Sequence, residues 1–303
     1  MGIDLISAGE KIPSIGRTLF VSENGSTTLT RAQALGKINK PVSLQRAFDI
    51  CQNGDCIHIF NGDYNGSYTL SSRNDIFIYY EIDNYNVKAT IMDVEATRIY
   101  TLNLVSCSHI QIVGGGNWGA ILNLNATNCS GYLSIKSVHI VFTLTINTSS
   151  DLFLLVKSSL IQGYNISAAY GSIADINECI TGTGMPAIST GFFIHFYNYK
   201  TRKLIARINS GKVVFDNCIL GEKMLTYHHR FDSSSGSAGT TEISYKNCII
   251  HNTLPSVCDS TNPNIKRLEM QNCVLLQHIT SGRIPDSYNG IIIDSNLIAG
   301  NFI

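Results

Sequence analysis

Charged side chains are scarce in this chain. Only 15% of its 303 residues are Asp, Glu, Lys or Arg, and 22 basic residues balance 22 acidic ones, so the formal net charge is zero. Proteins that bind nucleic acid carry a basic surface, and this composition excludes that class of partner. A surface with so little net charge is poorly protected against association, which favours a protein that works inside an assembly.

Long hydrophobic runs are also absent. A secretory signal has a basic start followed by an apolar stretch. The N-terminal segment MGIDLISAGEKIPSIG has neither. No segment approaches the roughly 18 uncharged apolar residues that a membrane-spanning helix needs. We therefore expect synthesis in a cytoplasm and no insertion into a membrane.

The cysteines lack the spacing of a common zinc site. There are nine of them, and no two form a CxxC pair. Because nine is an odd number, complete internal pairing into disulfides is impossible. We therefore expect reduced thiols that pack as small apolar side chains, and we expect no metal or other cofactor.

A short pattern repeats through the second half of the chain. Each copy is an alternating apolar run, then a polar pair, then a second apolar run. Equivalent positions of successive copies are mostly 20 to 30 residues apart, with one interval of 39, and roughly 20 to 25 residues make one turn of a three-sided solenoid. The repeat predicts an all-β fold, a single-stranded right-handed parallel β-helix whose longer intervals hold loop insertions or a second turn. The copies are residues 133–141, 154–161, 173–181, 213–220, 242–250, 267–275 and 291–298.

Stacked copies would place equivalent side chains in columns, about 4.8 Å apart. In VVFDNCIL (213–220), Phe215 points inward, Asn217 occupies a bend that needs a left-handed residue, and Cys218 resumes the inward side. We expect the asparagines to form a hydrogen-bonded corner ladder and the thiols to pack in the core. The predicted columns are Phe215, Tyr245, Met270 and Ile293; Cys179, Cys218, Cys248 and Cys273, ending at Asn296; and Asn217, Asn247 and Asn272.

The residue after each inward cysteine should point outward. These residues are all aliphatic, and a continuous exposed apolar stripe marks an interface. The prediction depends on register, because a slip of one residue would exchange the inner and outer columns. We expect other copies of the chain, as in a homotrimer, to cover this stripe and the open edge of the last coil. The stripe is Ile180, Ile219, Ile249, Val274 and Leu297.

The chain divides into two expected parts. Residues 1–40 form an N-terminal arm, in which SENGSTTLTRAQALGK has the composition of a loose polar connector. Residues 41–303 form the β-helix, with loop insertions at about 182–212 and 221–241. The aromatic run at 192–200 could stack on sugar rings, but a hairpin inside the first insertion, buried in the assembly, is the favoured interpretation.

Residues 41–65 carry a resemblance to a known family. Ser43 can cap a short amphipathic helix, SLQRAFDIC, and a tight turn and a strand, GDCIHIF, follow it. This stretch resembles the opening of pectate-lyase-like right-handed β-helix proteins, and the resemblance implies their fold over about 41–303. It implies no single activity, since that fold hosts lyases, hydrolases, epimerases and inert fibres. The matching residues are Ser43, Leu44, Ala47, Gly54, Asp55, Ile57, Ile59, Gly62 and Tyr64.

Enzymes of this family attack acidic polysaccharides, and the chain lacks their motifs. The polygalacturonase set, an Asp doublet with Gly-His-Gly and Arg-Ile-Lys, does not occur. Carboxylates on the predicted outer column are interleaved with cations, unlike a calcium site. The remaining weak catalytic candidates lie in the second insertion, where adjacent histidines suit acid–base chemistry or metal binding, although a polar loop packed on a neighbouring subunit is the favoured interpretation. They are His228, His229, Arg230 and Asp232.

Among proteins of this fold, the chain is most similar to appendage proteins of bacteriophages: tail spikes, tail fibres and head fibres. The resemblance implies a structural virion component that assembles in the host cytoplasm and acts without catalysis. Its partners would be other copies of itself, other virion proteins and host-surface polysaccharide. The alternative is a polysaccharide depolymerase, either a tail-spike lyase or a glycoside hydrolase. The missing motifs favour the structural role.

Overall fold

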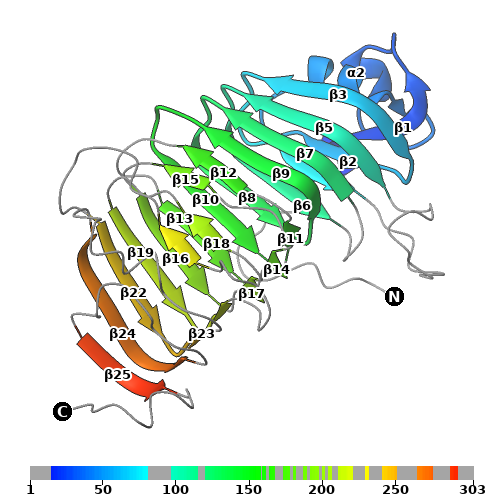
Figure 1. Ribbon diagram of the computed structural model, residues 1–303. Coiled ribbons are helices and arrows are strands. Elements are labelled where there is room, and N and C mark those ends of the chain that lie inside the picture. The colour runs from blue at the N-terminus through cyan, green and yellow to red at the C-terminus, as the bar shows by residue number, and fades with distance from the viewer. Residues whose placement is uncertain are drawn as a thin grey trace, which may run out of the picture.

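Parallel β-strands make up most of the computed structural model, and helices are few. The protein is therefore all-β, as predicted. Figure 1 shows the strands following one another along one long axis, from the N-terminal helices to β25. None of the helices described is long and apolar enough to cross a membrane. The structure describes residues 15–80, 97–114, 120–157, 159–161, 164–167, 173–177, 180–181, 187–189, 192–197, 200–201, 204–206, 211–220, 229–231, 241–250, 265–275 and 287–292.

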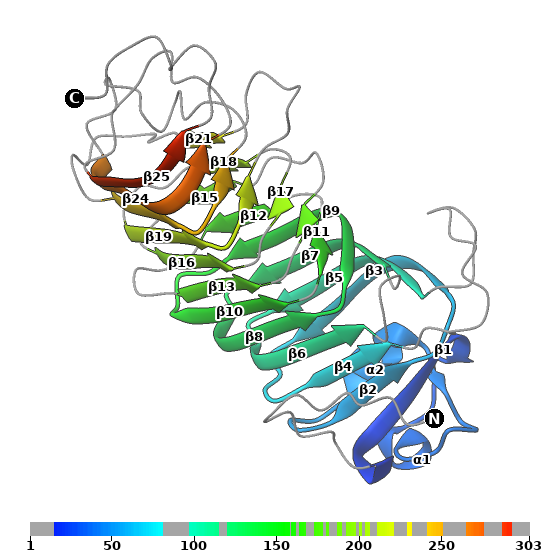
Figure 2. The ribbon, with the colours of Figure 1, turned by 90° about the horizontal axis from the view of Figure 1, so that it is seen from below.

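The first stack of parallel strands runs the length of the described chain. Each of its strands pairs in parallel with the next member of the stack, and Figure 2 shows the ladder from β2 to β19. Its members are β1 (Thr18–Ser26), β2 (Cys56–Ile59), β4 (Phe77–Tyr80), β6 (Ser108–Gly114), β8 (Ser130–Lys136), β10 (Leu152–Lys157), β13 (Ile173–Asn177), β16 (Phe192–Tyr197), β19 (Gly211–Asp216), β22 (Thr241–Lys246), β24 (Ile265–Leu275) and β25 (Ser287–Ile292).

Two further stacks alternate with the first along the chain. The second stack consists of β3 (Asp63–Ser71), β5 (Arg98–Val105), β7 (Ala120–Thr127), β9 (His139–Asn147), β12 (Tyr164–Ser167) and β15 (Ala187–Ser189). The third consists of the short strands β11 (Leu160–Ile161), β14 (Ile180–Thr181), β17 (Lys200–Thr201), β20 (Ile219–Leu220) and β23 (Ile249–Ile250). It joins the start of β9 at one end and the end of β24 at the other.

Strand β1 lies inside the segment that was expected to be an arm. It pairs in parallel with β2, Leu19 opposite Ile57 and Val21 opposite Ile59, and all four side chains are fully buried. The sheet therefore begins before residue 41. The physical reason is the apolar run Leu19–Val21, whose burial outweighs the polar composition of the residues that follow it. The 3-10 helix η1 (Ile15–Arg17) precedes β1, and α1 (Arg31–Ala34) follows it.

Helix α2 (Leu44–Ile50) forms as predicted. Ser43 caps it, its hydroxyl accepting a hydrogen bond from the N–H of Arg46 at 3.4 Å. The side-chain amide of Gln45 bonds both backbone groups of Thr69, at 3.1 Å to its carbonyl and 2.9 Å from its N–H. These bonds occupy the edge of β3, which would otherwise expose unpaired backbone groups. The buried side chains on the apolar face of α2 are Leu44, Ala47 and Phe48, and Cys51 follows just after the helix.

The core is built from in-register columns of apolar side chains. Five successive positions of one column in the first stack are β-branched residues, which suit a pleated strand, and each of the five is fully buried. They are Ile57, Ile78, Ile112, Ile135 and Val156. The second stack contributes alternate buried residues from β5, β7 and β9, namely Leu102, Leu104, Leu124, Ala126, Leu144 and Ile146.

The predicted aromatic column is confirmed for three of its four members. Phe215, Tyr245 and Met270 pair in register and are buried. The next position is Tyr288 and not Ile293, and Cys273 lies opposite Gly290 and not Asn296. The last repeat was therefore placed too late in the sequence. Both SYNGII (287–292) and the following isoleucine run alternate, so pattern alone left two registers open.

The 39-residue interval between copies holds an additional strand of the first stack. Asn177 pairs with Tyr197, and Tyr197 pairs with Asp216, so the steps are 20 and 19 residues. The aromatic run therefore forms β16, a member of the first stack, and the interpretation of 182–212 as a loop insertion with a hairpin was wrong. In the second predicted insertion, at 221–241, β21 (His229–Phe231) pairs in parallel with β18 (Leu204–Ala206).

Candidate functional site

Four neighbouring strands of the second stack carry no charged residue over most of their length. Figure 1 shows β3, β5, β7 and β9 side by side in the blue-to-green part of the molecule. Residues 65–71, 99–105, 121–127 and 140–147 contain no Asp, Glu, Lys or Arg. The uncharged stretch extends beyond these strands, since residues 99–135, which include β6, contain no charged residue either. We call the outward side of these four segments the neutral face.

Two columns of hydrogen-bonding side chains cross the neutral face. Leu102 and Leu104 are fully buried, so Thr101 and Asn103, which alternate with them, point outward. The same alternation recurs on β7 and β9 around Leu124 and Leu144. Every member of both columns is Ser, Thr or Asn. The first column is Ser67, Thr101, Asn123 and Thr143, and the second is Thr69, Asn103, Asn125 and Thr145.

Hydrogen bonds orient the amides in the second column. The side-chain amide of Asn125 donates to Oδ1 of Asn103 at 2.9 Å. The amide of Asn103 in turn donates to the hydroxyls of Ser67 at 2.9 Å and Thr69 at 3.4 Å. These bonds fix which edge of each amide accepts and which donates, so the array is ordered before any ligand arrives.

The other polar groups of the neutral face are uncommitted. Within the described part of the chain, the side chains of Thr101, Asn123, Thr143 and Thr145 make no hydrogen bond. They are only partly buried, so water satisfies them. Groups of this kind can exchange water for a ligand at little cost.

An apolar strip borders the polar columns. Tyr100 and Leu122 precede Thr101 and Asn123 on adjacent strands, and Phe142 precedes Thr143. The pairing between β7 and β9 shifts by one residue after Ile121, a bulge that places Phe142 outward with 56% of its surface exposed. Bulges commonly re-aim a side chain in this way. The neutral face therefore combines an exposed ring with hydrogen-bonding columns.

The charges at the start of β3 and β5 neutralise each other. Arg98 contacts Asp63 at 2.6 Å, and this hydrogen-bonded pairing raises the pKa of the arginine. The guanidinium also lies over the ring of Tyr100, 5.4 Å from its centroid. Arg98 pairs in register with Ala120, and Ala120 pairs with the buried His139. No unpaired charge from this row reaches the neutral face.

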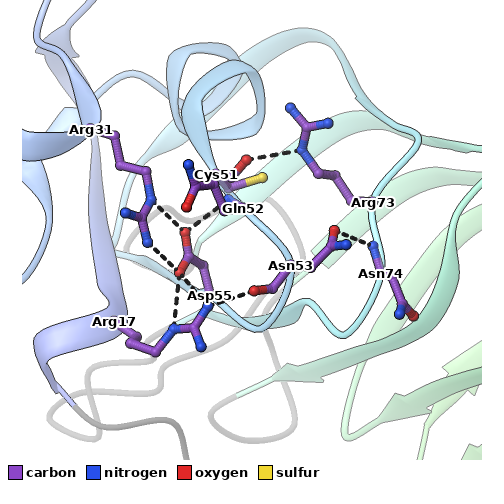
Figure 3. Close-up of polar contacts among 8 residues, drawn as sticks. All are labelled: Arg17, Arg31, Cys51, Gln52, Asn53, Asp55, Arg73 and Asn74. Carbon is purple, nitrogen blue, oxygen red and sulfur yellow. Dashed lines mark hydrogen bonds and ion pairs between the residues drawn. The ribbon is translucent and has the colours of Figure 1, made fainter.

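The buried carboxylate of Asp55 anchors the N-terminal end of the sheet. Figure 3 shows Arg17 and Arg31 converging on it, Arg31 with two bonds of 2.9 and 2.8 Å. Asp55 is fully buried and also accepts from the backbone N–H of Gln52 at 2.8 Å. The turn before it depends on Gly54, whose φ is +80°. We assign this cluster to structure, because Asp55 has no exposed surface for a ligand to contact.

The cysteine column lies inside the core. Cys218, Cys248 and Cys273 are buried, as predicted, and Cys179 lies outside the described residues. The hydrogen bond with Cys218, together with burial, raises the pKa of Cys248 to about 12. A thiol that stays protonated is a poor nucleophile and a poor metal ligand. No group of three His, Cys, Asp or Glu able to hold a metal occurs among the residues described.

The asparagine ladder forms at the predicted corner. Asn217, Asn247 and Asn272 have φ values of +52°, +53° and +55°. Asn272 donates to Oδ1 of Asn247 at 2.9 Å, and Asn247 donates to the carboxylate of Asp216 at 3.1 Å. The left-handed conformation explains why asparagine recurs at this position.

The predicted apolar stripe is shorter than expected. Ile219, Ile249 and Val274 pair in register and are partly exposed, Ile249 by 38%. Lys200 lies between Ile180 and Ile219, because strand β17 pairs with β14 on one side and β20 on the other. The stripe is therefore interrupted by a cation. Leu297 lies outside the described residues.

The weak catalytic candidates stay a prediction, because the structure describes the side chain of none of the four. His228 and Asp232 lie outside the described residues, and for His229 and Arg230 only the backbone of β21 is described, with Arg230 opposite Ile205. The neutral face was not predicted from the sequence, although the triplets TLN, NLN and TLT at 101–103, 123–125 and 143–145 recur at steps of 22 and 20 residues.

Comparison with known proteins returned no match to any protein-family model, curated protein or solved structure.

Proposed function

We propose that the three stacks are the sides of a right-handed parallel β-helix, and that the chain is a structural, non-catalytic appendage protein of a bacteriophage. The support for the fold is the order of the strands. The chain visits the first, third and second stacks in turn, as in β10, β11 and β12 and again in β13, β14 and β15. A chain that coils around a narrow core produces this order.

The observation that carries the proposed function is the exposed aliphatic row beside the asparagine ladder. Ile219 and Ile249 of the third stack lie in register with Val274 at the end of β24, and all three side chains are at least partly exposed. Exposed rows of this kind mark contacts with another protein. A second and third copy of the same chain would each bring the same row, so a homotrimer buries all of them at once.

Three further features suit a virion part that assembles in the host cytoplasm and contacts host-surface glycan. The cysteines described are all free and buried, which suits a reducing compartment. The zero net charge suits assembly more than dispersal. The neutral face supplies a surface for a polar, uncharged ligand. Other virion proteins would be the remaining partners.

Light scattering combined with a cleavage assay tests this proposal. We expect the purified chain to have three times its 33.2 kDa mass and to release no reducing ends from capsular polysaccharide. The double variant Ile219→Ser/Ile249→Ser should lower the mass toward that of one chain. The matched control is Ile38→Ser, which changes an isoleucine that is 63% exposed at the N-terminal end and should leave the mass unchanged.

Two outcomes would contradict the proposal. A wild-type monomer would remove the assembly role of the aliphatic row. Release of reducing ends would replace the structural role with the depolymerase alternative, and substitution of His228, Arg230 and Asp232 would then be the next step.

A further inference from the structure

We infer that the neutral face binds an uncharged glycan, with the ring of Phe142 packing on sugar and the Thr and Asn columns bonding its hydroxyls. This inference rests on the proposed function, an appendage protein that meets host-surface polysaccharide, and names the surface and the chemical class of the ligand.

The absence of charge selects the class of ligand. Acidic polysaccharides, nucleic acids and phosphate groups require basic side chains, and the four segments of the neutral face contain none. Arg98, at their border, is already paired with Asp63. An uncharged ligand brings no charge that would have to lose its water without a partner.

The type of polar group matches sugar hydroxyls. A hydroxyl both donates and accepts, and so does the side chain of each Thr and Asn in the two columns. Thr143, Thr145 and Asn123 have no side-chain partner among the described residues. Neighbouring strands are about 4.8 Å apart and alternate residues of one strand about 6.6 Å apart. The columns therefore offer a regular grid of such groups.

The exposed ring supplies the apolar part of the site. Phe142 is 56% exposed directly before Thr143, so a ligand bonded to the threonine hydroxyl can also cover the ring. Binding sites for small polar ligands usually pair an apolar surface with a few placed polar groups. The pre-oriented amides of Asn103 and Asn125 add donors and acceptors whose direction is already set.

A second copy of the chain is a less suitable occupant. The cores of protein interfaces are enriched in aromatic residues, Met and Arg, and Ser is depleted there. The neutral face has two full columns of Ser, Thr and Asn and one narrow apolar strip. The aliphatic row of the third stack meets the description of a protein interface better.

Affinity electrophoresis with three variants tests the inference. The probes are dextran, mannan and galactan as neutral polysaccharides and polygalacturonate as the acidic one, each cast into a native gel. We expect retardation by at least one neutral polysaccharide and none by polygalacturonate. Phe142→Ala and Thr143→Val should each weaken the apparent affinity tenfold or more, while Thr143→Ser, which keeps the hydroxyl, should stay within about threefold of wild type.

Phe153→Ala is the matched control, because Phe153 is another exposed phenylalanine, 37% exposed, on β10 of the first stack. It should leave retardation unchanged. Because Phe142 is largely exposed, its truncation should also leave the circular dichroism spectrum unchanged, which separates lost binding from lost folding.

Three results would overturn the inference: no retardation by any neutral probe, retardation only by polygalacturonate, or retardation that Phe142→Ala and Thr143→Val leave intact. A drop in mass by light scattering in Phe142→Ala would instead assign the face to a second copy of the chain. Since the wild-type mass and the release of reducing ends are measured separately, a trimer without neutral-glycan binding would refute this inference alone.

Discussion

The side-chain amide of Asn272 donates a 2.9 Å hydrogen bond to Oδ1 of Asn247, and both residues hold a left-handed backbone with φ near +54°. The two features depend on each other. The backbone conformation directs each side-chain amide along the ladder, and the hydrogen bond between the amides holds one strand end against the next. Asparagine therefore serves two physical roles at this position, which substitution can separate.

Replacement of Asn247 by Gly and by Ala separates these roles. Glycine accepts positive φ without strain but removes the hydrogen bonds, whose net contribution is about 1 kcal/mol. Alanine removes the same bonds and adds about 1 kcal/mol for the left-handed conformation. We expect Asn247→Ala to unfold at a lower urea concentration than Asn247→Gly.

Gln271, the residue before Asn272 of the ladder, is the control for the comparison at Asn247. It is exposed on β24 and its φ is not positive, so the order should reverse: Gln271→Gly should be less stable than Gln271→Ala, because glycine weakens an ordinary strand. If the glycine variant were the less stable one at both positions, the left-handed backbone of Asn247 would make no contribution to the free energy of unfolding.

Removal of the charge of Asp55 should destabilise the N-terminal end of the sheet. The carboxylate has no exposed surface and accepts from Arg17, Arg31 and the N–H of Gln52. Asp55→Asn keeps the shape but leaves two guanidinium groups without their anion, at a cost of about 3 kcal/mol. Equilibrium urea unfolding followed by circular dichroism would measure the change.

Asp63→Asn is the matched substitution at an exposed pair. Arg98 and Asp63 are 37% and 40% exposed, so water screens their attraction. The expected cost is at most about 1 kcal/mol. Equal costs for Asp55→Asn and Asp63→Asn would argue against a special role for the buried carboxylate.

Local chemistry made part of this fold predictable. Helix α2 was predicted because a capping serine precedes residues whose apolar side chains fall on one face. The inward cysteines and the corner asparagines were predicted because Asn and Cys recur at the same phase of an alternating run. Each of these signals lies within about ten residues of sequence and needs no knowledge of the rest of the molecule.

Elements without a local marker were misplaced. Strand β16 has no Asn-Cys pair after it, so this segment was taken for an insertion. A second alternating segment follows β25 in the sequence, and only the pairing of β25 with β24 shows which of the two segments is the strand. The residues that follow the apolar start of β1 in the sequence are polar, and the strand is held by its pairing with β2. Pairing partners, which sequence pattern does not specify, decided all three.

The neutral face was missed for a different reason. Catalytic and metal-binding sites are usually recognised by charged side chains, His or Cys, and the four segments of this surface contain none of these. Its segments are also separated in sequence, with Ser67 and Thr101 neighbours only through the pairing of β3 and β5. The bulge that exposes Phe142 likewise follows from the pairing and not from local composition.

Acid should destabilise the protein through His139. This side chain is 4% exposed, and its Nε2 has no hydrogen-bond partner within the described residues. Its in-register neighbours, Ala120 and Leu160, are uncharged, and the guanidinium of Arg98, one strand beyond Ala120, is paired with Asp63. Burial therefore lowers the pKa of His139 below its ordinary value of 6.5.

The sign of the effect follows from proton binding. Below about pH 6.5 the unfolded chain binds a proton at His139 that the folded chain does not, so the free energy of unfolding falls as the pH falls toward the lower, folded pKa. His139→Leu removes this contribution. We expect the loss of stability between pH 7.5 and pH 5, measured by urea unfolding, to be smaller in His139→Leu than in wild type.

His109→Asn is the control, because His109 is exposed, has positive φ that asparagine also tolerates, and contacts Asn74. If His139→Leu loses as much stability as wild type over this range, protonation of His139 is not what weakens the fold in acid.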